Sequence, residues 1–333
     1  MSDEAVRPSS GVLDVMVHVV GMAVYLVGLW LYIQVFGLPK QAIEVVICIW
    51  LGTVAWDVRR PVREHLLFLK DWWPPFVVFL AYLYSRGLSD DLGVFSVHVT
   101  EPIKFDKWLF GGTLPTEWLQ HHLCGNPCER SMAPRWYDVV LTTVYYSHFF
   151  AALAVAAFLW KRNRPQWVRY MRRYLTVISL AVVCFVVYPM APPWMASRDG
   201  YIGEVHRITG RGWFDLGSSH GSGGTTQQHV SAVGNQVAAM PSLHAGLAIL
   251  VALWGITQLR SRWRWALLLY PAAMMLMLVY YAEHYVLDEI AGAALVAGTM
   301  VGWSAWERRR AAAAAAEPGA PDAEPELDAA GAG

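Results

Sequence analysis

Residues 139–160 read VVLTTVYYSHFFAALAVAAFLW, a run that contains no Asp, Glu, Lys or Arg. A helix of about 20 mostly apolar residues crosses the hydrocarbon core of a bilayer. The composition of the whole chain agrees with this, because 56% of the 333 residues are hydrophobic and only 16% are charged. A soluble domain usually carries about 25% charged residues. The run therefore predicts a membrane-spanning helix in an integral membrane protein.

Seven further apolar stretches have a similar composition. Together they predict an all-α integral membrane protein with about eight transmembrane helices and two long extracytoplasmic loops. The first stretch follows Arg7 as a signal peptide would, but its length and the lack of an Ala-x-Ala site predict a retained membrane helix. The second, third and seventh stretches are short for a span. The eight stretches cover residues 12–36, 41–57, 73–88, 139–160, 174–191, 239–259, 266–281 and 285–306.

The basic residues predict the orientation, because cytoplasmic loops of membrane proteins are rich in Lys and Arg. With the N-terminus inside, 17 of the 26 Lys and Arg residues fall in cytoplasmic segments and nine fall in the outer loops. Both termini are therefore expected in the cytoplasm. The formal net charge is zero, so no overall basic field indicates a nucleic-acid partner.

The chain is expected to divide into three parts. Residues 1–70 hold the N-terminal membrane helices and a cytoplasmic loop, 71–307 hold the membrane domain with the candidate catalytic residues, and 308–333 form a cytoplasmic tail. The Ala, Pro, Gly and acidic composition of the tail predicts disorder. The outer loop 89–137 is expected to lie partly on the outer leaflet. The apolar residues that indicate this are Trp108, Leu109, Phe110, Trp118 and Leu119.

Polar residues gather at the expected start of the sixth span, in the string NQVAAMPSLH at residues 235–244. Proline suits the first turn of a helix, so Pro241 predicts that the backbone N–H groups around Ser242 and Leu243 face outward, where a helix N-terminus binds phosphate. His244 lies in the same turn. The simpler interpretations are helix capping for Pro-Ser and an interfacial side chain for a lone His.

A second polar string, YYAEHYVLD at residues 280–288, separates the last two spans. His284 and Asp288 are four residues apart, so on one helix they share a face, where a carboxylate can raise the basicity of an imidazole. A simple helix-surface pair is the alternative. The topology places both residues at the same outer surface as His244. Two His and one carboxylate at one depth predict metal-free phosphoryl transfer, in which one His attacks phosphorus and the other protonates the leaving oxygen.

These strings resemble the catalytic motifs of the type 2 phosphatidic acid phosphatase superfamily. They are most similar to its inositol phosphorylceramide synthase-like (inositolphosphotransferase) branch, which includes bacterial relatives. AMPSLHAG at 239–246 and EHYVLD at 283–288 resemble the second and third motifs, and YPMAPPW at 188–194 resembles a segment of this branch. The resemblance covers about residues 70–306 and implies a six-helix core. Three residues around the start of the fourth span fit it more loosely: Asp138, Tyr145 and His148.

The resemblance implies a role for each of the three candidate catalytic residues. His284 becomes the nucleophile, Asp288 its orienting carboxylate and His244 the acid and base, with a phosphohistidine intermediate. The implied reaction moves a phosphoryl or phospho-headgroup unit from a lipid phosphate ester to an alcohol, such as inositol, or to water. It takes place at the extracytoplasmic face of a plasma membrane, expected to be that of a bacterium. No cofactor and no metal are expected.

Two phosphate-binding cations of the phosphatase branch are missing from their usual places. Arg-Pro occurs at residues 7, 60 and 164, each time without the Lys of the pattern Lys-x6-Arg-Pro. The position that corresponds to the Arg of the third motif is Leu278. These departures favour the transferase-like branch over simple phosphatidate hydrolysis.

Some other charge must then neutralise the phosphate. Arg198 is the preferred candidate because it follows the break at Pro192 and Pro193, although it can instead pair with Asp199. The residues expected to bind substrate are Ser242, Asn235, Arg198, Tyr281 and Glu283. For the last two, packing between the final helices is the alternative. The other cations of the outer loops that remain candidates are Arg135, Arg207, Arg211, Lys104 and Lys107.

Cys124 and Cys128 lie in the long outer loop, where a local disulfide is plausible but is left open by the sequence. The neighbouring His121 and His122 do not have the spacing of a common zinc site.

A non-enzymatic lipid transporter or scramblase with polar helix ends is the rival function. An intramembrane serine protease is poorly supported, because Gly-x-Ser-Gly does not occur within a span. The sequence leaves open the lipid donor, the acceptor, the choice between hydrolase and transferase, and the oligomeric state.

Overall fold

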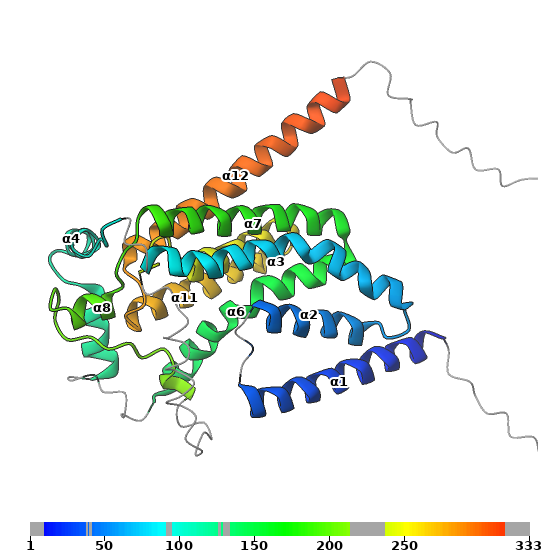
Figure 1. Cartoon of the computed structure of the whole chain (residues 1–333), viewed down its shortest axis with the longest axis horizontal. Helices are drawn as coiled ribbons and strands as arrows, with labels where there is room; N and C mark the ends of the chain where they lie inside the picture. The colour runs from blue at the N-terminus through cyan, green and yellow to red at the C-terminus, as the bar shows by residue number, and fades with distance from the viewer. Residues whose placement is uncertain are drawn as a thin grey trace, which may run out of the picture.

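The computed structural model describes residues 10–37, 39, 42–90, 95–125, 128, 134–213 and 237–316. These residues form helices joined by loops, and their only β-structure is isolated bridges that link residues 98, 190 and 238 (Figure 1). The predicted all-α class is therefore confirmed. The long helices are α1 (Ser10–Phe36), α2 (Ala42–Trp56), α3 (Val62–Asp90), α6 (Trp136–Arg162), α7 (Arg164–Val187), α10 (Leu243–Gln258), α11 (Leu269–Tyr280) and α12 (Val286–Ala316).

Each of the eight predicted apolar stretches coincides largely with one of these long helices. Among the described residues, five segments are long and apolar enough to cross a membrane: α1, α6, α7, α12, and the 3-10 helix η3 (Arg262–Leu268) continued by α11. The helices α2 and α10 are apolar but shorter. The structure thus confirms an integral membrane protein with several apolar helices, whereas the number of eight spans stays a prediction.

Two helices begin earlier than the apolar stretches predict. α7 begins at Arg164, within a predicted cytoplasmic loop, because the Asn163 side chain accepts the backbone N–H of Gln166 at 3.1 Å and caps the helix. α3 begins at Val62 and continues through the expected boundary at residues 70 and 71. Hydropathy detects only the apolar part of a helix that extends beyond the bilayer with polar turns.

The end of α12 corrects the predicted tail. The sequence predicts disorder from residue 308, but the helix continues to Ala316. The run 311–316 consists of Ala, which is the strongest helix former, so the helix persists after its apolar part has ended. The remainder of the predicted tail lies outside the described residues.

α10 is the central helix of the bundle. It packs against α6, α7, α11 and α12, and its residues Ala245 and Leu250 are completely buried. The main hydrophobic core joins α10 to α3, α6 and α7 around buried residues such as Tyr170 and Val177. By contrast, α1 packs on α2 at the edge of the bundle (Figure 1). The first turn of α10 consequently lies among the other helices.

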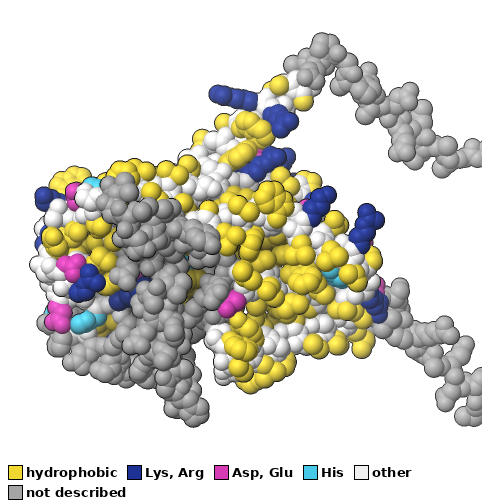
Figure 2. All heavy atoms as spheres, in the orientation of Figure 1, with side chains coloured by type: hydrophobic (Ala, Val, Ile, Leu, Met, Phe, Trp, Pro, Cys, Tyr) yellow, Lys and Arg dark blue, Asp and Glu magenta, His cyan; other side chains and the backbone are white. Residues whose placement is uncertain are grey.

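Short helices cover the end of the bundle at which α10 and α12 begin. α4 (Thr100–Leu109) and α8 (Pro193–Arg198) lie at this end, at the left of Figure 1. The two outer loops that carry these helices, one before α6 and one before α10, contain three further short elements. They are α5 (Pro115–Leu119), the π-helical turn η1 (Gln120–Cys124) and η2 (Arg211–Trp213). Trp108, Phe110 and Trp118 are exposed, and hydrophobic side chains cover much of the bundle surface visible in Figure 2. Exposed aromatic residues beside an apolar belt are typical of a lipid–water boundary.

Candidate active site

The three predicted catalytic residues form one row. His284 Nδ1 lies 3.3 Å from Asp288 Oδ2, and His284 Nε2 lies 3.4 Å from Nδ1 of His244. Asp288 is completely buried and His284 is 5% exposed, so little water competes for these contacts. A carboxylate at Nδ1 favours the tautomer that carries its proton there, which leaves the Nε2 lone pair directed at His244. The geometry fits the predicted roles, which themselves remain a proposal.

The start of α10 differs from the predicted one. The helix begins at Leu243, and the Ser242 hydroxyl caps it by accepting the Ala245 N–H at 3.3 Å. Pro241 therefore precedes the cap and does not stand in the first turn. The Ser242 N–H donates to the Asp288 carbonyl at 2.9 Å, so this group is not directed at a phosphate as predicted. The substrate role predicted for Ser242 is untested, and its known contacts are structural.

A close approach between α10 and α12 brings the two His residues together. A Cβ atom on Gly292 would lie 2.5 Å from the Ser242 carbonyl oxygen, a distance that no side chain tolerates. Glycine at this position lets the start of α10 rest on the first turns of α12. His244 is thereby placed beside the residues that precede α12, including His284.

The turn that carries His284 is fixed by two other segments. Ala282 adopts the left-handed conformation, with φ of 60°, and its carbonyl accepts the Trp194 N–H at 3.2 Å. Gln120 Nε2 donates to the Tyr280 carbonyl at 3.0 Å. The turn is therefore attached to both outer loops, which restricts the position of the imidazole.

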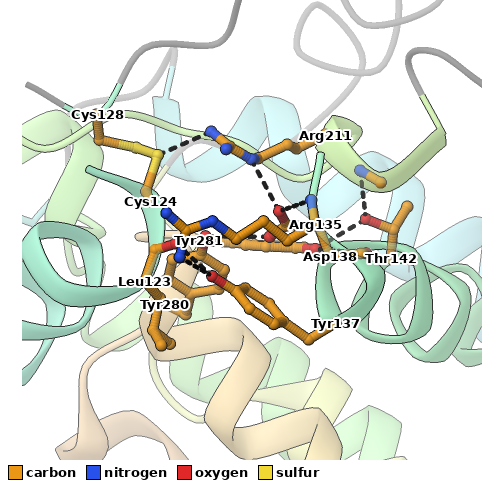
Figure 3. Close-up of polar contacts among 11 residues, drawn as sticks. Leu123, Cys124, Cys128, Arg135, Tyr137, Asp138, Thr142, Arg211, Tyr280 and Tyr281 are labelled. Carbon is orange, nitrogen blue, oxygen red and sulfur yellow. Dashed lines mark hydrogen bonds and ion pairs between the residues drawn. A yellow bond between two sulfur atoms is a disulfide. The ribbon is translucent and has the colours of Figure 1, made fainter. Parts of the chain in front are cut away.

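Tyr281 also fixes this turn. The side chain is completely buried, and its hydroxyl lies 2.8 Å from Thr142 Oγ1 and donates to the Asp138 carbonyl at 3.2 Å. Asp138 itself pairs with Arg211 at 3.0 Å and accepts the Tyr280 hydroxyl at 3.0 Å (Figure 3). These contacts match the packing alternative for Tyr281. They leave the predicted substrate role untested.

Asp106 of α4 holds the start of α12 and was not singled out from the sequence. Its carboxylate accepts the backbone N–H groups of Val286 at 2.9 Å and Leu287 at 3.1 Å, and so caps the helix that carries Asp288. Burial raises the pKa of Asp106 to about 6, and these two hydrogen bonds oppose the shift only in part. No local pattern connects residue 106 with residue 286, so only the fold reveals the contact.

Two residues of α6 line the other side of His244. The Tyr145 ring stacks on the His244 ring with centroids 5.3 Å apart, and the His148 ring centroid lies 4.1 Å from that of His244. Tyr145 and His148 are two of the residues that fit the family resemblance only loosely. The structure places them directly beside the predicted acid and base.

Arg207 is the cation that the structure brings to the His284 turn. Its guanidinium forms an ion pair with Glu283, with Nη2 3.0 Å from Oε2 and a second contact through Nε. The guanidinium also lies over the Trp194 ring, 5.5 Å from its centroid. Glu283 is 8% exposed. A guanidinium held by a planar, two-point contact to the residue that precedes His284 is a candidate for binding phosphate.

Arg198, which the sequence favours as the phosphate-binding cation, does not pair with Glu283. It pairs with the adjacent Asp199 at 2.7 Å, and its side chain is 56% exposed. This is the alternative foreseen for Arg198, and its predicted phosphate role is untested. Asn235, the remaining predicted substrate-binding residue, lies outside the described residues.

The outer loop is cross-linked. Cys124 and Cys128 form a disulfide, and Arg211 Nη1 donates to Cys124 Sγ at 2.8 Å (Figure 3). This answers the question that the sequence left open. In the described part of the chain, no group of three or more His, Cys, Asp or Glu is arranged to hold a metal ion. The prediction of metal-free chemistry remains a prediction.

A model of the PAP2 superfamily matches residues 121–302, which is more than half of the chain. The chain belongs to the PAP2 superfamily. A phosphoinositol dihydroceramide synthase from Bacteroides thetaiotaomicron is 22% identical over 254 residues, which cover 70% of this chain and 75% of that protein. This similarity confirms the predicted inositol phosphorylceramide synthase-like branch, and with the family it places the chain among lipid phosphotransferases and phosphatases. No solved structure matches the chain.

Proposed function

We propose that this PAP2 superfamily member transfers a phosphoryl or phospho-headgroup unit from a lipid donor to an alcohol, through a phosphohistidine at the extracytoplasmic face. The observation that carries the proposal is the row formed by Asp288, His284 and His244, with 3.3 and 3.4 Å between successive side chains. The family match covers all three residues. A buried carboxylate behind one imidazole, and a second imidazole in front of it, suit nucleophilic attack and proton transfer.

In the first step, His284 Nε2 attacks the phosphorus of the lipid phosphate ester. A phosphorus–nitrogen bond forms, the bond from phosphorus to the lipid oxygen breaks, and His244 gives its proton to that oxygen. Asp288 stabilises the positive charge that develops on the His284 ring. In the second step, the acceptor hydroxyl loses its proton to His244 and attacks phosphorus, and the phosphorus–nitrogen bond breaks. His244 then carries the proton that it needs for the next cycle.

Arg207 is proposed to neutralise the charge of the phosphate group. It is bound to Glu283, which immediately precedes His284, and two of its five N–H donors serve that ion pair. A further donor contacts the Tyr145 hydroxyl, and the donors that then remain suit the phosphate oxygens. The start of α10 adds the positive end of a helix dipole at His244.

An inositol-like acceptor or headgroup is proposed because the relative is named a phosphoinositol dihydroceramide synthase. The absence of the phosphatase-branch cations, with Leu278 at one of their positions, favours transfer over hydrolysis. Transfer to an alcohol requires that the acceptor reach the phosphohistidine before water does. The proposed enzyme lies in a bacterial plasma membrane with both termini in the cytoplasm.

The test uses purified protein in lipid nanodiscs with donors that carry radioactive phosphorus. Phosphatidylinositol and phosphatidic acid are supplied separately, each with and without a lipid alcohol such as ceramide. Transfer predicts a labelled product lipid that forms only when the acceptor is present. Release of soluble phosphate at a rate unchanged by the acceptor would establish a hydrolase. No reaction with any donor, together with lipid movement that survives His284→Gln, would support the transporter or scramblase alternative.

A further inference from the structure

A cavity lies behind the His284 turn, bounded by α5, α11, α12 and the loop that joins α4 to α5. Its volume is about 510 Å³, which falls within the range of ligand sites. Most of the lining is apolar and includes Phe110, Trp118, Met275 and Leu276. Phe110, Trp118 and Leu276 are 46%, 51% and 47% exposed, so the cavity opens on the outer surface of the bundle. That surface faces lipid in the proposed orientation.

One buried carboxyl group reaches this apolar lining. Glu289 of α12 lines the cavity and is only 2% exposed. Its Oε1 atom has no hydrogen-bond partner among the described residues. A buried polar atom without a partner costs about 1–3 kcal/mol, so such a group indicates a missing partner. A ligand that donates a hydrogen bond would supply that partner.

The charges around the cavity exclude one kind of ligand. The described lining residues include no Lys, Arg or His, and the carboxyl groups of Asp288 and Asp106 interact electrostatically with Glu289. An anionic phosphate would be repelled here. The cavity is therefore chemically different from the row of His residues, where Arg207 supplies positive charge.

We propose that this cavity binds a neutral lipid alcohol, whose hydroxyl donates to Glu289 while its hydrocarbon chain lies along Phe110, Met275 and Leu276. Thr113, which also lines the cavity, offers a second polar contact near the mouth. The occupant enters from the bilayer, because the exposed lining residues belong to the apolar surface of the bundle. Glu289 directly follows Asp288 on α12, so an occupant sits behind the turn that orients His284. This site goes beyond the proposed reaction and does not depend on its chemistry.

The test compares three photoactivatable lipids with identical chains: a diacylglycerol, its methyl ether and the corresponding phosphatidic acid. The protein is studied in nanodiscs as His284→Gln, so that turnover cannot interconvert the probes. Labelled peptides are identified by mass spectrometry. Diacylglycerol should label the segments around Phe110 and Met275–Val279. The methyl ether, which lacks the donor, should label them about tenfold less, the equivalent of one lost hydrogen bond.

Three substitutions locate the site. Glu289→Leu should lower diacylglycerol labelling about tenfold, and Glu289→Gln, which keeps a carbonyl acceptor, should retain it within about twofold. Leu276→Trp, which fills the cavity, should lower it as Glu289→Leu does. Thermal unfolding verifies that each variant is folded, and if Glu289→Leu is not, the methyl ether on the parent protein decides the matter. Equal labelling by the ether, or by phosphatidic acid at the same peptides, would overturn the proposal while leaving the proposed reaction intact.

Discussion

His284 Nε2 lies 3.4 Å from Nδ1 of His244, although 40 residues separate the two in the chain. His244 belongs to the first turn of α10, and His284 lies just before α12, so both helices begin at the same end of the bundle. The contact depends on Gly292, which permits the close approach of the two helices. A phosphorus atom that meets one imidazole in this arrangement is within reach of the other.

Asp288→Asn tests the orienting role of the carboxylate. The amide cannot stabilise the charged ring and can present an N–H group to His284 Nδ1, which favours the wrong tautomer. We expect kcat to fall roughly 10²- to 10⁴-fold, with the KM of the lipid donor changed by less than about threefold. Steady-state kinetics in nanodiscs measures both. The matched control is Glu307→Gln. Glu307 lies on a different part of α12, where it forms an ion pair with Arg173 of α7. A kcat for Asp288→Asn near that of the control would refute the role.

Arg207→Gln tests which of the two arginines that lie over Trp194 binds the phosphate. A hydrogen bond to a charged group is worth about 1.5–3 kcal/mol, so loss of the Arg207 guanidinium should lower kcat/KM for the lipid donor about 10- to 100-fold. Arg198→Gln removes an exposed pair with Asp199 and should change kcat/KM by less than about threefold. The same assay with both variants gives the comparison. The opposite ranking would restore Arg198 as the phosphate-binding residue.

Tyr281→Phe separates packing from substrate binding. The change removes the hydroxyl that contacts Thr142 Oγ1 and the Asp138 carbonyl, so the free energy of unfolding should fall by about 1 kcal/mol, with a lower Tm. Thr142→Val breaks the first of these contacts from the other side, and because it also removes the acceptor of the Gly212 N–H it should lower Tm at least as much. The KM of the lipid donor should stay constant in both. A raised KM in Tyr281→Phe at unchanged Tm would instead show that Tyr281 contacts substrate.

Asp106 makes stability depend on pH. Its folded-state pKa is raised to about 6, above the value of an unfolded chain, because burial outweighs the hydrogen bonds from Val286 and Leu287. Between about pH 4 and pH 6 the folded protein thus holds a proton that the unfolded chain releases, and the free energy of unfolding falls as pH rises. Asp106→Asn does not titrate. Wild type should therefore lose stability relative to this variant, on the order of 1 kcal/mol, as pH rises through this window.

Denaturant unfolding at several pH values measures this difference between the two proteins. All other titrating groups are shared, and those that do not interact with Asp106 cancel in the comparison. Asp288 and Glu289 interact with Asp106, so the difference reports the titration of Asp106 together with its effect on these two groups. A constant difference, or one that grows in favour of wild type as pH rises, would contradict the raised pKa of Asp106.

The sequence predicts best the features that depend on residues close together in the chain. Apolar periodicity locates the helices, and the spacing of His284 and Asp288 predicts that the two side chains lie close together, as the 3.3 Å contact shows. The helical explanation of this spacing was wrong, because His284 precedes the first residue of α12. His244 requires one further step, which is the topology that places both helix starts at one surface. Helix ends are predicted less well, because α3, α7 and α12 continue with polar or Ala-rich turns that hydropathy does not register.

Contacts made by the outer loops could not be predicted. Asp106 caps α12 from 180 residues away in the chain, and no spacing rule connects such partners. Arg198 and Arg207 are equally basic, and both lie over Trp194, but only Arg207 pairs with Glu283. The path of the loop between α8 and η2 decides this, and that path depends on tertiary contacts. Phosphate-binding residues in such loops are therefore identified from the fold.

The most direct measurement is the trapping of an acid-labile phosphate on the protein. Purified wild type, His284→Gln and His244→Gln are mixed with lipid donor carrying radioactive phosphorus, quenched at alkaline pH and mapped by mass spectrometry. The proposed mechanism predicts label on His284 in wild type, no label in His284→Gln, and blocked turnover in His244→Gln. Full turnover by His284→Gln, or label on a different residue in wild type, would contradict it.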